Sequence, residues 1–206
     1  MSRTGCFSLL GLLACGDPLA GAAYKGEELY AIAGTVSDES LVELPADQLR
    51  VTILWARPDS GTAPYEPSIE VDTTFPARYR LGLFSPPDAA SLNDAPWGGG
   101  VALGVPVLYQ DTDGDGSFND ARDGDPVVGG TDQVLLIYAT ETVPVPDGET
   151  GLEPLAPGFH ALEFSGEPCQ PDLEHPIAID PDAVELIIAA GLEYEPPIGC
   201  EGGHPP

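Results

Sequence analysis

The residues best suited to chemistry form one acidic segment, DTDGDGSFNDARDGD, at positions 111–125. Six of its fifteen side chains are aspartates, and without a counter-ion their carboxylates repel one another. Oxygen atoms of carboxylates and carbonyls are the ligands of hard cations, and Ca²⁺ takes about six to eight of them at roughly 2.3–2.6 Å. The segment is therefore either a solvated acidic turn or a cation-binding loop.

The first half of this segment has the spacing of a calcium loop. Carboxylates alternate along it, Gly116 permits a sharp turn, and Phe118 can anchor the loop to a core. The candidate ligands of this half are Asp111, Asp113, Asp115, Ser117 through its backbone carbonyl, and Asn119 directly or through water. The pattern resembles the D-x-D-x-D-G loop of EF-hand and dockerin-like proteins, and this resemblance implies Ca²⁺ as the cofactor.

The second half of the segment departs from that pattern. Arg122 stands at the position where the resemblance leads one to expect a bidentate Glu. Asp120, Asp123 or Asp125 can substitute for it, and the sequence leaves the choice open. Because the flanks have strand rather than helix patterns, no helix pair can open as it does in a sensor. We expect a structural site with a dissociation constant on the order of 10⁻⁴–10⁻³ M, as in extracellular modules.

Short strands must position this loop. Period-two alternation of apolar and polar residues, bounded by Pro, Gly, Asp and Asn, is typical of strands. Seven segments show it: Leu29–Val36, Leu49–Arg57, Ser68–Thr73, Ala77–Phe84, Val101–Gln110, Gln133–Glu141 and Gly158–Phe164. In the second of them Val51, Ile53 and Trp55 share one face. The absence of helical patterns between these segments predicts a mainly β fold, an antiparallel β-sandwich over residues 29–166.

Three stretches between residues 30 and 85 carry a further resemblance, IAGTV, LRVTILWA and FPARYRLGL. They resemble the opening strands of transthyretin-like and carboxypeptidase-regulatory-like sandwiches, and Ig-like sandwiches share the same texture. The resemblance implies the fold class and does not extend to function.

The C-terminal segment, residues 167–206, has a different composition, rich in Pro and acidic residues. We expect it to form an irregular arm outside the sandwich. Its one apolar stretch is Ala183–Ala190. Asp180 can cap a short helix there, with Pro181 at the first helical position and Gly191 just past the end. The same stretch can instead form a strand that joins the sheet, so both alternatives stay open.

The N-terminus reads MSRTGCFSLLGLLAC, with one positive charge at Arg3 and an apolar run over Cys6–Leu13. That run is too short to span a membrane but suits a signal peptide. Its end, LLAC, resembles the lipobox of bacterial lipoproteins. The resemblance implies a signal peptide over residues 1–14, a lipid on Cys15, a lipidated tether over residues 15–28, and export. The alternatives are a plain secretory signal and a chance apolar N-terminus on a cytosolic protein.

The lipid would be the contact between this protein and a membrane. In the sorting rule of enterobacterial lipoproteins, an Asp directly after the lipidated Cys retains the protein at the inner membrane. Gly16 occupies that position here. The resemblance therefore implies attachment to the outer membrane and leaves open which face of it carries the protein.

Two cysteines remain after removal of the signal peptide and lipidation, Cys169 and Cys200. An exported compartment is oxidising, so we expect a disulfide between them that closes the C-terminal arm. Closing a loop of about 30 residues would stabilise the fold by roughly 3–4 kcal/mol on the chain-entropy model. A catalytic thiol or a metal-binding pair is the alternative, although neither cysteine lies in a C-x-x-C motif.

Charge and missing motifs exclude several function classes. Seven Lys and Arg stand against 34 Asp and Glu, a formal net charge of −27. This balance argues against binding of nucleic acid and against docking on anionic lipid through a basic patch. Hydrophobic residues make up 42% of the chain, which indicates a folded protein rather than a disordered one. The sequence contains no G-x-S-x-G, H-E-x-x-H or Walker-type motif.

We therefore expect a non-enzymatic, lipid-anchored envelope protein with a structural calcium site and a structural or binding role. One alternative is a carbohydrate or small-molecule binder in which the ion or exposed aromatic rings at Trp55 and Trp97 help form a site, unless Trp97 packs over the end of the sandwich. The other is an envelope hydrolase with a site that no motif reveals. The identity of a protein or glycan partner stays open.

Overall fold

The computed structural model describes residues 26–40, 48–58, 61–96, 98–119, 124–131, 133–144, 154–167 and 170–189, together with Tyr194 and Pro196. Several predictions fall outside these residues. They concern the signal peptide, the lipid on Cys15, the ring of Trp97, the acids Asp120 and Asp123, and the Cys169–Cys200 disulfide. Within the described part of the chain, no helix is long and apolar enough to cross a membrane.

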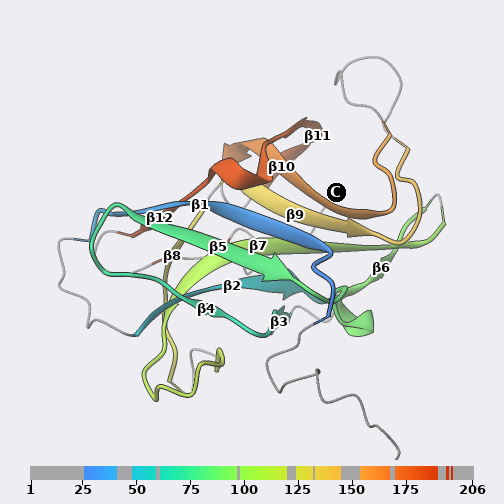
Figure 1. Cartoon of the computed structure of the whole chain (residues 1–206). Coiled ribbons are helices and arrows are strands. Elements are labelled where there is room, and N and C mark those ends of the chain that lie inside the picture. The colour runs from blue at the N-terminus through green and yellow to red at the C-terminus, as the bar shows by residue number, and fades with distance from the viewer. Residues whose placement is uncertain are drawn as a thin grey trace, which may run out of the picture.

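The fold is mainly β, as predicted (Figure 1). Its strands are β1 Tyr30–Asp38, β2 Leu49–Ala56, β3 Thr62–Pro64, β4 Ile69–Glu70, β5 Ala77–Leu83, β6 Asn93–Asp94, β7 Gly100–Gln110, β8 Val127–Gly130, β9 Val134–Ala139, β10 Gly158–Glu167, β11 Gln170–Ala178 and β12 Val184–Ile188. Two 3-10 turns accompany them, η1 Ala89–Ser91 and η2 Pro181–Ala183. Every strand predicted from alternation is present, and Ser68–Thr73 shortens to β4.

The strand β7 is the branching point of a 12-stranded sheet. On one side it pairs along most of its length with β2, which also carries β3 and β4. On the other side its first part pairs with β9, which leads to β10 and β11. Its last part pairs with β8, which leads to β12, β1 and β5. The sheet therefore folds over at β8 into two facing layers, the sandwich-like arrangement visible in Figure 1.

The main core lies between these two layers. Alternation decides which side chains enter it, because successive residues of a strand point to opposite faces. In β2, Val51, Ile53 and Trp55 belong to this core whereas Leu54 belongs to a separate apolar cluster, which confirms the predicted shared face. In β5, Tyr79 and Leu81 are buried, whereas Arg78 and Arg80 are exposed. Burial of apolar surface at about 25 cal/mol per Å² is what holds the layers together.

The helix considered over Ala183–Ala190 is wrong, and the alternative strand is present. Asp180 does cap a turn, since its side chain accepts a hydrogen bond from the Asp182 backbone N–H at 2.9 Å. The turn ends after three residues, and β12 continues with Val184, Leu186 and Ile188 buried on one face. Alternation of buried and exposed residues suits a strand, and sheet pairing outweighs the local helix signal.

This strand also corrects the prediction of a purely antiparallel sheet, because β12 runs parallel to β1. The pairing is unusually close at Gly34, where an added Cβ would lie 1.9 Å from the carbonyl oxygen of Val184. The Tyr79 hydroxyl donates to the same carbonyl at 3.1 Å. Only glycine fits at position 34.

Four strands had no clear sequence signal, the short β3 and β6 together with β8 and β11. β8 is four residues long and half glycine, and β11 contains two prolines. Proline lacks a backbone N–H and is tolerated on edge strands, and β11 pairs only with β10 among the described strands. Both β11 and β12 belong to the segment predicted as an irregular arm, so part of that segment completes the sheet.

Candidate metal centre

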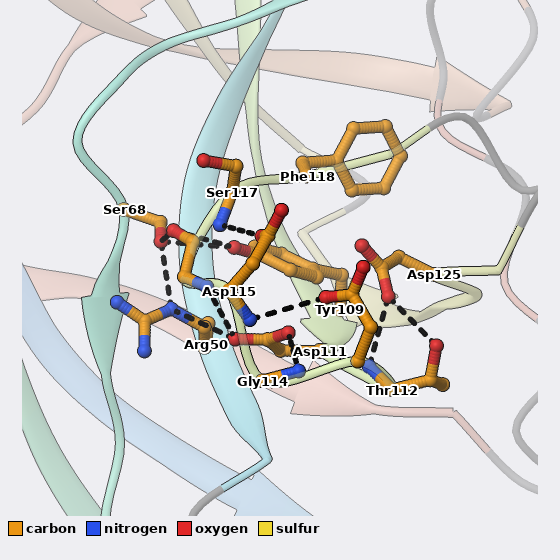
Figure 2. A network of polar contacts seen from close by, with 12 residues as sticks. Arg50, Ser68, Tyr109, Asp111, Thr112, Gly114, Asp115, Ser117, Phe118 and Asp125 are labelled. Atoms are coloured by element: carbon orange, nitrogen blue, oxygen red, sulfur yellow. Dashed lines mark hydrogen bonds and ion pairs between the residues drawn. The ribbon is translucent and has the colours of Figure 1, made fainter.

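The acidic segment forms a loop between β7 and β8, at the end of the sheet where β2 also begins (Figures 1 and 2). The Asp111 backbone N–H donates to the Gln48 carbonyl at 2.7 Å, and the Gln110 N–H donates to the Pro126 carbonyl at 3.0 Å. Both ends of the loop are thus held to the sheet by backbone hydrogen bonds.

Three of the predicted ligands come together in this loop. One carboxylate oxygen from each of Asp111, Asp113 and Asp115 lies within 4.8 Å of the others. Asp111 is 1% exposed, whereas the other two carboxylates face solvent. The three carboxylates repel one another at this spacing. A divalent cation between them would attract each one and outweigh that repulsion. Oxygen-only donors of this kind fit a hard cation.

Backbone N–H groups of the loop aim these carboxylates. Asp111 accepts from Gly114 at 2.8 Å and from Gly116 at 2.9 Å, one bond to each oxygen. Asp113 accepts from the Asp115 N–H at 3.1 Å. The two glycines have φ angles of 74° and 82°, a left-handed conformation that favours glycine. Gly116 therefore has the backbone conformation expected of the predicted turn residue.

Ser117 and Asn119, the other predicted ligands of the first half, hydrogen-bond carboxylates of the loop through their backbone N–H groups. The Ser117 N–H donates to Asp115 at 2.7 Å, and the Asn119 N–H donates to Asp125 at 2.9 Å. Between them, the Phe118 ring meets the Tyr109 ring edge-on, with centroids 5.1 Å apart. Phe118 thus attaches the loop to the sheet, as Figure 2 shows.

Asp125 closes the loop through hydrogen bonds. Its carboxylate is 1% exposed and accepts from the Thr112 N–H at 2.8 Å as well as from Asn119, so it joins the two halves. Among the described residues, the carboxylates that meet are Asp111, Asp113 and Asp115, and Asp125 is not one of them. The acids Asp120 and Asp123 lie outside the described residues.

Burial of the Asp125 carboxyl raises its pKa, but the hydrogen bonds from Thr112 and Asn119 outweigh burial and leave the pKa below its ordinary value of 3.8. A depressed folded-state pKa contributes stability that is present above the unfolded-state pKa and lost as the pH falls through the folded-state value. With both proteins in chelator, we expect Asp125→Asn to have a lower free energy of unfolding at pH 7 than the wild type. Below about pH 4 the free energy of unfolding of the variant should depend less on pH. Urea unfolding across pH 2–7 measures this, and parallel profiles would contradict it.

A polar network beneath the loop was not predicted. The Arg50 Nε lies 3.8 Å from an Asp111 oxygen and donates to the Ser68 hydroxyl at 2.8 Å. Ser68 in turn donates to the Gly116 carbonyl at 2.7 Å and accepts from the Tyr109 hydroxyl at 2.9 Å. Burial, the largest influence, raises the pKa of Tyr109 to about 12, so its hydroxyl stays protonated and able to donate.

The alternative ligand-binding site at Trp55 and Trp97 is not supported at Trp55. Trp55 was considered as an exposed ring for ligand binding, but it is 2% exposed and packs near Phe159 in the main core. This is a correction, and its cause is the alternation of β2, which turns Trp55 inward with Val51 and Ile53. Trp97 lies outside the described residues.

Comparisons with known proteins gave no match. No family model, no curated protein and no solved structure matches this chain at a significant level. The chemistry of the acidic loop is therefore the basis for a functional proposal.

Proposed function

We propose that the acidic loop binds Ca²⁺ and that the protein is an exported, lipid-anchored component of a bacterial cell envelope with a non-enzymatic, structural or binding role. One observation carries the calcium proposal: three carboxylates converge within 4.8 Å while backbone N–H groups hold their orientation. A cation bound between these carboxylates would offset their mutual repulsion and so stabilise this arrangement.

Calcium suits this loop better than magnesium. The loop offers three carboxylates plus nearby carbonyl oxygens, more protein ligands than Mg²⁺ takes, since Mg²⁺ keeps several waters in strict octahedral geometry. Ca²⁺ accepts irregular arrangements of six to eight oxygens, roughly the number that carboxylates, carbonyls and water can supply here. Arg50 beside Asp111 offsets part of the negative charge, which is consistent with a weak site.

The proposed site is structural. The loop joins β7 to β8, and the Gly116 carbonyl connects it to Ser68 beside β4. An ion that holds Asp111, Asp113 and Asp115 together would hold this corner of the sheet together as well. Its flanks are strands with fixed registers, so ion binding has no helix pair to rearrange.

Calcium titration by isothermal calorimetry tests the proposal. We expect one site in the wild-type chain and a loss of affinity of about tenfold or more in Asp113→Asn and in Asp115→Asn, because each removes one charged ligand. Asp94→Asn is the matched control, since it removes an exposed aspartate from β6. Equal affinities in all four proteins, or no binding, would contradict the proposal.

Lipidation is tested separately, because it rests on the sequence LLAC at residues 12–15. We expect Cys15→Ser to release the protein from the membrane fraction and to remove the mass of the acyl chains, whereas Cys6→Ser should keep both. Intact mass spectrometry and fractionation measure these outcomes. Thiol labelling of the denatured, unreduced protein checks the second expectation, that Cys169 and Cys200 form a disulfide. An unlipidated wild-type protein would refute the anchor.

A further inference from the structure

A second apolar cluster lies on the outer face of the layer formed by β2, β7, β9 and β10. Its residues point away from the main core, and all are at most 5% exposed: Leu54, Val105, Val107, Leu135, Leu162 and Phe164. An outer sheet face of this composition must be covered to stay out of water. The partly buried side chains that pack against it include Phe118 and Tyr194.

Phe118 belongs to the acidic loop, and two of the loop's carboxylates hydrogen-bond the backbone on both sides of it. The residue before it donates to Asp115, and the residue after it donates to Asp125. The Phe118 N–H donates to Glu66 at 3.1 Å. A change in the loop's carboxylates therefore acts on the backbone to both sides of the ring that covers the cluster.

Tyr194 reaches the same cluster from the C-terminal side. Its hydroxyl donates to the Thr131 carbonyl at 2.8 Å. A Cβ added at Gly130 would lie 2.7 Å from the ring carbon Cζ and from the hydroxyl oxygen, so Tyr194 packs directly on this glycine. Gly130 ends β8, the strand that begins two residues after Asp125. Val127 of β8 also packs against the cluster. β8 thus connects Asp125, which hydrogen-bonds both halves of the loop, to Gly130 and Thr131, which contact Tyr194.

We propose that ion binding in the acidic loop and docking of Tyr194 are energetically coupled through this shared apolar cluster. This inference rests on the proposed calcium site. Calcium fixes the loop, the loop seats Phe118, and Phe118 and Tyr194 together exclude water from one face. Each cover is more stable when the other is in place. By linkage, the effect of calcium on Tyr194 equals the effect of Tyr194 on calcium affinity.

Two measurements on the full chain test the coupling. We expect calcium to slow hydrogen exchange in the peptide that contains Tyr194. We expect Tyr194→Ala to weaken calcium binding about fivefold or more by calorimetry, although Tyr194 is no ligand. Tyr194→Phe, which removes only the hydroxyl, should give a smaller loss in the same direction. Ile177→Ala is the control, because Ile177 is an apolar side chain on β11 that is 62% exposed.

The outcomes separate the two proposals. Calcium binding with equal affinity in wild type and both Tyr194 variants, and no change in exchange, would overturn the coupling and leave the calcium site intact. No calcium binding by the wild-type chain would overturn both. Weakened binding in Ile177→Ala to the same extent would show a general loss of stability and would overturn the coupling as stated.

Discussion

Removal of calcium should lower the free energy of unfolding by about 1.4–2.7 kcal/mol when the reference condition is 10 mM Ca²⁺. The range follows from a dissociation constant on the order of 10⁻⁴–10⁻³ M and the rule that a ligand of the native state stabilises by RT ln(1 + [L]/Kd). For a protein of this size, such a change corresponds to a fall in Tm of roughly 3–10 °C. Differential scanning calorimetry in calcium and in excess chelator measures it.

The variant Asp111→Asn should abolish most of this calcium dependence and should also destabilise the metal-free protein. Asp111 is buried, accepts two backbone hydrogen bonds and lies beside Arg50, so its loss leaves Arg50 without its ion-pair partner. Asp113→Asn, at an exposed position, should reduce the calcium response with little effect in chelator. Equal melting temperatures of the wild type with calcium and with chelator would rule out a structural calcium site.

Gly34→Ala should destabilise the fold by about 3 kcal/mol or more, at or above the upper end of the range for overpacking. The added methyl carbon would lie 1.9 Å from the Val184 carbonyl oxygen, and that atom belongs to the backbone of β12. A backbone atom cannot turn away as a flexible side chain can, so β1 and β12 must separate. Urea unfolding measures the loss, and poor recovery of folded protein would be its extreme form.

Gly100→Ala provides the matched control. The added carbon at position 100 would meet only the Leu92 side chain, at an ordinary contact distance of 3.4 Å. We expect a change within about 1 kcal/mol in either direction, since removing glycine also lowers the entropy of the unfolded chain. Similar losses in the two variants would show that the close pairing at Gly34 does not limit stability.

Local patterns predicted the strands that alternate strongly, and they failed where partners far away in sequence decide. β5 could be delimited because it has one apolar and one polar face, and β2 because Val51, Ile53 and Trp55 share one apolar face. β12 was ambiguous because Asp180 and Pro181 signal a helix start, and its pairing with β1 is invisible from the stretch itself. β8 carries two glycines, which are rare in strands, and they are needed because the β12 backbone and the Tyr194 ring approach them closely.

The candidate site divides in the same way. Asp111, Asp113 and Asp115 could be found because their spacing along the chain is itself the signal. Arg50 and Ser68 could not, because the fold brings them from β2 and from the residue before β4 to the loop. Glu66, which accepts from Phe118, is equally distant in sequence. A loop can show its own ligands, whereas the groups that support it depend on tertiary structure.

The parallel pairing of β1 with β12 also has a consequence for the order of folding. β1 obtains one of its partners, β5, from nearby in the chain, but the other comes from almost the opposite end of the described residues. Pairing across such a separation has a high entropic cost of loop closure and tends to form late. Until β12 pairs with it, one edge of β1 has no strand partner and the main core lacks the apolar side chains of β12. The first strand of this fold is therefore among the last to be completed.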